Sequence, residues 1–188
     1  NYIEVEDFGN ETIFKILKKN KDKKFLYFKE IIKLLNQMQS IKDKKIRNFK
    51  NKYYRIPEYK REILIQEANL FCEWYVKKNL PKNKRQDFNK KFKKIIKTLS
   101  SCLKMKNNIF VHRDFHVSNL MLVNERIGVI DSQDALIGNR AYDLASLVDD
   151  VRLKTSKVLK KKILNFYMSI QKKIDKKNIK NDFEILSI

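Results

Sequence analysis

Three side chains between residues 114 and 131 have the types and the spacing that phosphate chemistry uses. Asp114 and Asn119 lie five positions apart, and Asp131 follows twelve residues after Asn119. A carboxylate can accept the proton of an attacking hydroxyl, whereas an Asn amide oxygen and a second carboxylate suit a hard divalent cation. In phosphoryl transfer, one Asp acts as the base while an Asn and another Asp hold the magnesium that neutralises the nucleotide phosphates. The spacing therefore predicts a phosphoryl-transfer site.

The surrounding sequence predicts short strands that would bring these side chains together. Three apolar runs have the character of β-strands: residues 108–111, 120–123 and 127–130. The polar turn 124–126 joins the second run to the third, which predicts a hairpin. A loop between the first two strands can turn Asp114 and Asn119 into one cleft, and Asp131 stands at the end of the third strand. The order His-Arg-Asp-x4-Asn, hairpin, Asp is that of the protein-kinase catalytic loop.

Apolar residues recur at helical spacing through most of the remaining chain. The helices that this spacing predicts are residues 11–17, 26–39, 59–79, 86–104, 141–152 and 157–173. Two of them are expected to bury apolar stripes: Ile63, Leu70, Phe71 and Trp74 in the third, and Phe88, Phe92, Ile95, Leu99 and Leu103 in the fourth. We also expect a strand at 2–5, an acidic turn ending at Gly9, an irregular stretch at 41–56 and a mobile polar tail at 175–182.

Length and composition indicate one packed domain. The chain has 188 residues, of which 43% are apolar and 11% aromatic, enough for one core and too few residues for two domains. No apolar run approaches the ~20 residues needed to cross a bilayer, and the chain does not open on a signal-peptide pattern. Cys72 and Cys102 are too few and too far apart for a disulfide framework or a zinc site. We expect both to be buried free thiols in a reducing compartment, which favours the cytoplasm.

The formal net charge of +21 leaves two interpretations open. A basic excess can serve phosphate-bearing partners such as nucleic acid. However, the 43 basic residues include only eight Arg, the residue preferred for gripping phosphate, and the Lys residues are scattered along the whole chain. Biased composition explains such a pattern without any polyanion-binding function. A polyanion surface, if present, is expected on the Lys face of the helix at 86–104, with Lys90, Lys91, Lys93, Lys94 and Lys97.

Further motifs distinguish between kinase families. The residues after Asp131 include neither Asp-Phe-Gly nor Ala-Pro-Glu, both expected of a protein kinase. His116 after Phe115, and the run Tyr-Asp-Leu-Ala-Ser-Leu at 142–147, resemble the aminoglycoside phosphotransferase and choline kinase-like superfamily. Within it, His-Arg-Asp-Phe-His-x-x-Asn-Leu-Met and Asp-x-Gln-Asp-Ala resemble the bacterial anomeric N-acetylmuramate/N-acetylglucosamine kinases. Residues 59–75 are similar to their substrate-side helix.

The resemblance extends over residues 2–155 and implies the fold. It implies an α+β, mostly helical C-terminal lobe of the protein-kinase-like fold, with a small central β-hairpin. Residues 1–9 would be a remnant of the hinge, and residues 10–188 would be the lobe, truncated at both ends. The N-terminal lobe would be absent and encoded upstream of residue 1. Ser132 departs from the Phe found at its position in the family, which affects fine tuning more than mechanism.

The resemblance also implies roles for individual residues. Asp114 would be the catalytic base, and Asn119 and Asp131 the magnesium ligands that hold the nucleotide, with Glu6 beside it at the hinge. The acceptor-side candidates are His116, Asp134, Glu67 and Trp74, and the structural candidates are His112 and Asp143. Ordinary explanations compete with these roles, because loop Asp residues form turns, Trp on an apolar stripe packs in a core, and a first-turn Asp stabilises its helix.

The implied activity is ATP- and Mg²⁺-dependent phosphorylation of a small-molecule hydroxyl. The acceptor would be an amino sugar of cell-wall recycling, with choline, homoserine or an aminoglycoside as alternatives within the superfamily. An inert kinase-like module that binds a polyanion is the alternative outside the enzymes. The three glycines, Gly9, Gly128 and Gly138, form no phosphate-covering loop, and no lysine is placed to grip phosphates. We therefore expect this chain alone to bind ATP weakly and to turn over negligibly.

Overall fold

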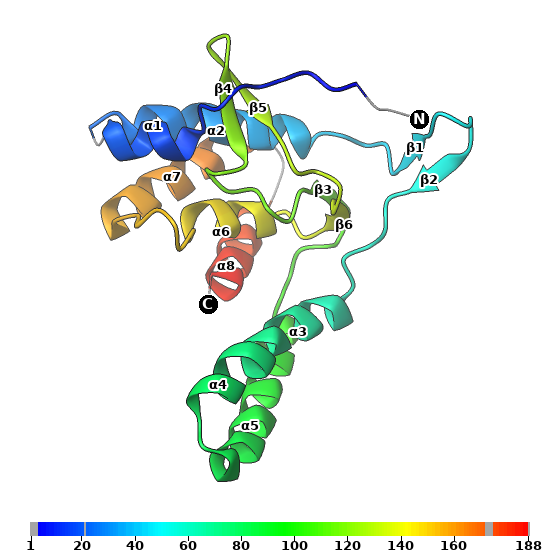
Figure 1. Ribbon diagram of the computed structural model, residues 1–188, viewed down its shortest axis with the longest axis vertical. Coiled ribbons are helices and arrows are strands. Elements are labelled where there is room, and N and C mark those ends of the chain that lie inside the picture. The colour runs from blue at the N-terminus through cyan, green and yellow to red at the C-terminus, as the bar shows by residue number, and fades with distance from the viewer. Residues whose placement is uncertain (1–3, 21, 172–174, 188) are drawn as a thin grey trace.

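The computed structural model describes residues 4–20, 22–171 and 175–187, most of them in helices (Figure 1). The helices are α1 (Ile13–Lys19), α2 (Lys24–Met38), α3 (Arg61–Leu70), the π-helical segment η1 (Phe71–Val76), α4 (Lys77–Asn79), α5 (Lys82–Ser101), α6 (Tyr142–Val148), α7 (Lys157–Ile170) and α8 (Lys176–Leu186). The strands are β1 (Lys45–Arg47), β2 (Tyr53–Arg55), β3 (Ile109–Val111), β4 (Leu120–Val123), β5 (Arg126–Val129) and β6 (Leu136–Gly138). The predicted α+β, mostly helical class is confirmed.

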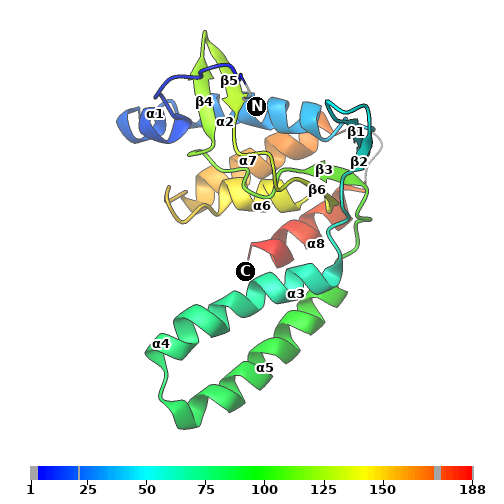
Figure 2. The ribbon, with the colours of Figure 1, turned by 45° about the vertical axis from the view of Figure 1, so that its right-hand side comes forward.

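The core lies where α1, α2, α6, α7 and α8 meet beneath the β4–β5 hairpin. Its fully buried side chains include Leu17, Phe28, Phe115, Leu144 and Tyr167. Phe115 belongs to the segment between β3 and β4, so this segment is anchored in the core rather than lying loosely on the surface. Helices α3, α4 and α5 form a separate helical hairpin that projects away from this body (Figures 1 and 2).

Two small antiparallel sheets position the segments of chemical interest. The predicted β4–β5 hairpin is present and pairs Leu120 with Val129 and Val123 with Arg126. Arg126 therefore begins β5, whereas the sequence predicted it in the turn. The second sheet pairs β3 with β6, which follows it only after the hairpin, and sets Val111 opposite Leu136. Because β3 leads into residues 112–119 and residues 131–135 lead into β6, this pairing brings the two segments side by side. Strand β6 was not predicted, since three residues carry too little periodicity.

The N-terminal segment lies on the β4–β5 hairpin. Phe8 covers Gly128 so closely that a Cβ there would stand 2.6 Å from the Phe8 Cε2 atom. The Leu122 N–H donates to the Glu11 carbonyl at 2.9 Å, which extends the pairing to the residues before α1. The acidic turn is present, because the Gly9 N–H donates to Asp7 at 2.8 Å. Residues 4 and 5 are not in a strand, and the rest of the strand predicted at 2–5 lies outside the described residues.

Two other segments differ from the prediction. The stretch 41–56 contains the exposed hairpin β1–β2 instead of being irregular throughout. The tail expected to be mobile at 175–182 forms most of α8, because Asp182 is fully buried and accepts three hydrogen bonds of 2.7 Å. The donors are the backbone N–H groups of Lys104 and Met105 and the Asn139 amide. Polar composition alone could not reveal this partner set.

The apolar stripes of the helical hairpin are much less buried than predicted. Trp74 is 76% exposed, Ile95 56%, Leu70 47% and Phe71 42%. Helices α3 and α5 cover each other on one side, as Figure 2 shows, and no third layer of the described residues covers the other side. Cys72 is buried as expected, but Cys102 is exposed at the end of α5. None of the helices that the structure describes is long and apolar enough to cross a membrane.

Candidate active site

The segment from His112 to Asn119, called the HRD loop below, is fixed at its start by Asp143. The Asp143 carboxylate accepts the backbone N–H groups of His112 at 2.8 Å and Arg113 at 3.1 Å. Asp143 is fully buried, and this burial raises its pKa to about 7, although the two N–H donors oppose the shift. Arg113 adopts a left-handed conformation with φ of 77°, which is uncommon for a residue with a side chain. The loop therefore takes its shape from a carboxylate 30 residues further along the chain.

His112 connects the HRD loop to the end of β5. Its side chain is fully buried, and the ring Nε2 lies 3.0 Å from the Ile130 carbonyl oxygen. Burial lowers the His112 pKa, so the ring is neutral at pH 7 and Nε2–H donates to that carbonyl. The position beneath the loop, away from solvent, fits the structural role implied for His112.

Asn119 and Asp131 meet because of the hairpin register. The pairing of Leu120 with Val129 continues to the Ile130 N–H, which donates to the Asn119 carbonyl at 3.1 Å. The Asn119 Nδ2 then lies 3.4 Å from Asp131 Oδ2 and donates to the Asp114 carbonyl at 3.1 Å. Asp131 has a left-handed φ of 70°, which turns its side chain back toward Asn119. The Asn119 side chain thus connects Asp114, the candidate base, to Asp131, the other candidate metal ligand.

These two side chains fit a magnesium site of the kind that keeps much of its hydration. Among the residues described, no group of three or more His, Cys, Asp or Glu side chains could form an all-protein metal site. Mg²⁺ usually takes one or two carboxylates and completes its octahedron with water and phosphate oxygens. A turn of the Asn119 amide would direct its oxygen, in place of Nδ2, toward the same space. Gln133 Nε2 donates to Asp131 Oδ1 at 2.7 Å and orients that carboxylate.

Asp114, the candidate base, is exposed on the HRD loop. Its carboxylate makes no hydrogen bond or ion pair with any residue that the structure describes. Its backbone is well fixed: the carbonyl accepts from Asn119, and the adjacent Phe115 ring is fully buried. A rigid backbone with a free, solvated carboxylate can act as a general base once a substrate hydroxyl lies within hydrogen-bond reach.

The four acceptor-side candidates do not form one cluster. Glu67 lines a cavity of about 480 Å³ between the helical hairpin and the body, together with Tyr142 and mainly apolar side chains. Trp74 lines a different surface hollow with Glu73, Lys77 and Lys78. Asp134 is exposed, and its carbonyl lies 3.5 Å from the Arg113 Nη1. The structure thus places Glu67 and Trp74 on different faces of the hairpin.

His116 and Glu6 have contrasting environments. His116 is only 7% exposed, and its Nδ1 has no hydrogen-bond partner among the described residues. Its pKa is lowered by burial first and by Arg152 second, so the ring is neutral at pH 7. Glu6 is exposed in the extended segment before α1. Its neighbour two residues on, Phe8, is the residue that holds this segment to the β4–β5 hairpin.

The structure adds residues that sequence reasoning did not select. Arg113, the middle residue of His-Arg-Asp, forms an ion pair with Glu67, and Glu67 also accepts a hydrogen bond from the Tyr59 hydroxyl. Gln133 orients Asp131, as described above. Each of these contacts joins residues from different elements, except that of Gln133. The signal that could have directed attention to Arg113 is its place directly before the candidate base.

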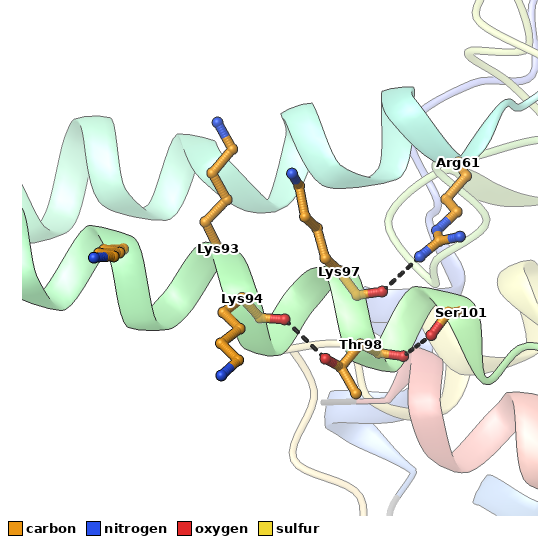
Figure 3. Close-up of a pocket in the computed structure, with 7 residues that line it drawn as sticks. Arg61, Lys93, Lys94, Lys97, Thr98 and Ser101 are labelled. Atoms are coloured by element: carbon orange, nitrogen blue, oxygen red, sulfur yellow. Dashed lines mark hydrogen bonds between the residues drawn. The ribbon is translucent and has the colours of Figure 1, made fainter.

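A cationic groove lies on the outer face of the helical hairpin, lined by Arg61, Lys90, Lys93, Lys94, Lys97, Thr98 and Ser101 (Figure 3). Arg61 donates to the Lys97 carbonyl at 2.8 Å and to Ser100 at 3.1 Å, so it ties α3 to α5. Lys91 is not part of the groove and pairs with Asp87. None of the side chains of the HRD loop lines the groove, so any anion bound there would be bound apart from Asp114.

Residues 15–167 match the profile of the phosphotransferase enzyme family. An N-acetylmuramate/N-acetylglucosamine kinase of Neisseria meningitidis is 44% identical over 95 residues, and one of Pseudomonas aeruginosa is 35% identical over the same length. Each match spans 50% of this chain and 28% of the relative, so the likeness is confined to about a quarter of those enzymes.

Solved structures of aminoglycoside phosphotransferases share the fold. The ADP-bound APH(2'')-Ib superposes on this chain with a TM-score of 0.60 at 20% sequence identity. The superposition covers 98% of this chain and 58% of the APH(2'')-Ib chain. APH(2'')-IIa in its complex with gentamicin superposes with a TM-score of 0.59 at 20% sequence identity. This superposition covers 98% of this chain and 57% of the APH(2'')-IIa chain. The chain therefore has the architecture of somewhat more than half of such a kinase, as its sequence motifs predict.

Proposed function

Because this chain belongs to the phosphotransferase enzyme family, we propose that it supplies the catalytic half of an ATP-dependent small-molecule kinase. The observation that supports this proposal most directly is that Asn119 Nδ2 lies 3.4 Å from Asp131 Oδ2. This pair lies next to the HRD loop, on which Asp114 is exposed. Buried Asp143 holds that loop by two backbone N–H groups. This is the arrangement that phosphoryl transfer needs, since the enzyme's task is positioning and charge neutralisation.

The proposed reaction is one in-line transfer. The Asp114 carboxylate accepts the proton of the acceptor hydroxyl while the hydroxyl oxygen forms a bond to the γ-phosphorus of ATP. The bond from that phosphorus to the β,γ-bridging oxygen breaks, and ADP leaves with the bonding electron pair. Asn119 and Asp131 would hold Mg²⁺, which neutralises the phosphate charge. Asp114 then releases its proton to solvent.

An amino sugar is the acceptor class that we propose. The support is the names of the relatives, N-acetylmuramate/N-acetylglucosamine kinases, which are 32–44% identical to this chain over 95 residues. A net charge of +21 suits an anionic acceptor such as N-acetylmuramate better than a cationic one. Choline would require an aromatic cage, and an aminoglycoside an acidic acceptor face. His116, Asp134, Glu67 and Trp74 remain the acceptor-side candidates, and the two free thiols favour a cytoplasmic reaction.

We propose further that the chain needs a nucleotide-binding lobe supplied by sequence upstream of residue 1. Residues 1–9, with Glu6, would be the hinge, and residues 10–188 the acceptor-side lobe. The support is that the chain holds no glycine-rich loop or lysine placed to cover phosphates. Asp114 and Asp131 are also exposed and Asn119 is half-buried in the described structure, whereas closing an active site to water strengthens the electrostatic interactions inside it.

A panel of acceptors tests the proposal. The protein extended by its upstream coding sequence is incubated with ATP and Mg²⁺ and with N-acetylmuramate, N-acetylglucosamine, choline, homoserine or an aminoglycoside. We expect transfer to an amino sugar, a loss of about 10²–10⁴-fold in Asp114→Asn, and no turnover by residues 1–188 alone. Steady turnover by residues 1–188, dead in Asp114→Asn, would remove the need for a second lobe. No transfer to any acceptor would overturn the kinase proposal.

The polyanion-binding alternative has its own observation in the cationic groove of Figure 3. If it were the function, the chain would bind duplex nucleic acid at nanomolar concentration, with a steep loss of affinity as salt increases. Substituting Lys93, Lys94 and Lys97 by Gln would then reduce the salt slope, and Asp114→Asn would change nothing. We expect instead that the chain binds duplex nucleic acid weakly at low salt and not at physiological salt, because a few exposed lysines contact few phosphates at once.

A further inference from the structure

We propose that the ion pair between Arg113 and Glu67 is a positioning link through which the helical hairpin sets the alignment of Asp114 toward the acceptor. The inference rests on the proposed kinase function and deepens it. Arg113 directly precedes Asp114 in the HRD loop, whereas Glu67 lies on α3, 46 residues earlier. Neither residue touches the reacting atoms in this proposal, so both act through the position of Asp114.

The backbone of Arg113 is held in an uncommon conformation. Its φ of 77° is a conformation that a residue with a Cβ keeps only when its surroundings over-determine it. The surroundings do so from three sides: Asp143 accepts the Arg113 N–H at 3.1 Å, Glu67 accepts from its Nη2, and the Asp134 carbonyl lies 3.5 Å from its Nη1. Release of the guanidinium would leave one of these restraints, the Asp143 bond, to hold the residue before the base.

Both carboxylate oxygens of Glu67 accept hydrogen bonds from other residues of the chain. Its Oε1 accepts from Arg113, and its Oε2 accepts from the hydroxyl of Tyr59. Both oxygens therefore have structural partners before any acceptor binds. Arg113 and Glu67 are about equally sheltered, with side chains 27% and 28% exposed, so water screens the pair only in part. This environment favours a maintained contact over a transient surface pair.

The ion pair between Arg113 and Glu67 also belongs to a network that crosses the fold. The Arg113 guanidinium lies over the Tyr59 ring, 5.7 Å from its centre, and that ring meets Tyr142 of α6 edge-on at 4.9 Å. Tyr59 is 1% exposed, and its N–H donates to the Ile137 carbonyl of β6 at 2.8 Å. Glu67 is thereby connected at once to the HRD loop, to β6 and to α6.

Glu67 also links the helical hairpin to the rest of the fold. In the part of the chain that the structure describes, the side-chain hydrogen bonds of α3 are those of Arg61 and Glu67. Arg61 binds Lys97 and Ser100 within the hairpin, whereas Glu67 binds Tyr59 and Arg113 outside α3 and α5. Glu67 also lines the cavity of about 480 Å³ between hairpin and body. A ligand that moves α3 at this cavity would therefore move the Arg113 side chain and, with it, the base.

Transfer to an acceptor is sensitive to such movement, whereas other steps are not. A displacement of about 1 Å at the reacting groups can cost on the order of 100-fold in rate. Hydrolysis of ATP by water needs the metal and nucleotide but no acceptor aligned by the hairpin. Loss of the ion pair should therefore lower kcat for phosphoryl transfer to the acceptor. It should leave unchanged both the KM for ATP and the slow hydrolysis of ATP by water.

The test uses the active, upstream-extended protein with Glu67→Gln, Arg113→Gln and the double variant. We expect acceptor kcat to fall by about 10–100-fold in each single variant, and by no more in the double variant because the two residues act as one unit. Arg113→Lys should restore only part of the rate, since Lys lacks the planar fork. Arg61→Gln is the matched control: it removes two hydrogen bonds of the same helix away from the HRD loop, and kcat should stay unchanged.

A second measurement on residues 1–188 does not depend on catalysis. Glu67→Gln should speed amide hydrogen exchange at His112 and Arg113 by about tenfold or more, and Arg61→Gln should not. If the wild-type protein phosphorylates no acceptor, the proposed function fails, and the exchange result alone decides whether the link exists. If the wild type is active and the variants keep kcat within twofold, the link is wrong. An equal fall in acceptor transfer and in ATP hydrolysis by water would also overturn it, as would strictly additive losses.

Discussion

The carboxylate of Asp143 accepts the backbone N–H of His112 at 2.8 Å from the first turn of α6. This hydrogen bond joins a helix to a loop residue 31 positions earlier. The same carboxylate also accepts the N–H of the next residue, Arg113. A carboxylate held between two N–H groups of one loop defines the direction in which that loop leaves β3. The geometry of the candidate base two residues later thus depends on a side chain that takes no part in the chemistry.

The buried position of Asp143 predicts a pH-dependent stability. Its pKa is raised by burial from 3.8 to about 7, so between these pH values the folded chain binds a proton that the unfolded chain has released. The corresponding stability is complete below about pH 4 and is lost as pH rises through 7, on the order of 1 kcal/mol per pH unit. Urea unfolding from pH 4 to 8 measures this slope.

Asp143→Asn is the control, because it keeps the shape and cannot ionise. His112 and His116, whose pKa values are lowered by burial, give the opposite slope in both proteins. The difference between wild type and variant therefore isolates Asp143. A difference that stays constant from pH 4 to 8 would show that Asp143 does not titrate in this range.

The pair Asn119 and Asp131 predicts a weak divalent-cation site in residues 1–188 alone. Mn²⁺, added as a paramagnetic probe, should broaden the NMR signals of residues near 119 and 131 first. Asp131→Ala should weaken this effect about tenfold or more, and Asn119→Ala less, because an amide carries no charge. Asp134→Ala is the matched control, an exposed carboxylate three residues away. Equal loss of broadening in Asp131→Ala and Asp134→Ala would mean that the cation is held by general negative charge.

Asp182 predicts a large stability effect from the part of the sequence that looked least structured. Asp182→Ala would leave the N–H groups of Lys104 and Met105 and the Asn139 amide without their partner. Buried donors without partners cost about 1–3 kcal/mol each, so we expect a loss of at least 3 kcal/mol in urea unfolding. Asp175→Ala on the same helix removes an exposed N-cap and should cost about 1 kcal/mol. Similar losses for the two variants would contradict the anchoring role of Asp182.

Gly128 predicts how the N-terminal segment is held. In Gly128→Ala the new Cβ would stand 2.6 Å from the Phe8 ring, which must move away. We expect about 1–3 kcal/mol of destabilisation and faster proteolysis within residues 4–9. Phe8→Ala should have a similar effect, and the double variant should lose no more than either single variant because the two residues share one contact. Additive losses of stability would mean that Gly128→Ala destabilises the protein through a contact other than the one with Phe8.

The sequence determined the parts of this protein that depend on neighbouring residues. The order of Asp114, Asn119 and Asp131, the turn of the β4–β5 hairpin and the helical spacing are local patterns, so the strands beside the HRD loop and most helices could be predicted. The hairpin itself was predicted, but its turn is one residue shorter than the predicted 124–126, because Arg126 pairs with Val123. The observed register brings Asn119 to Asp131. Motif and local geometry therefore agree here.

Only the tertiary structure decided the contacts between distant segments. The β3–β6 pairing, the hydrogen bonds of Asp143 to the HRD loop, the ion pair of Arg113 with Glu67 and the hydrogen bonds of buried Asp182 join residues 25 or more positions apart. No local pattern encodes them, because each depends on which surfaces meet when the core closes. For the same reason Trp74 and Ile95, apolar and at helical spacing, are exposed on a hairpin that no third layer of the described chain covers. Periodicity sets which face of a helix is apolar, and packing decides whether that face is buried.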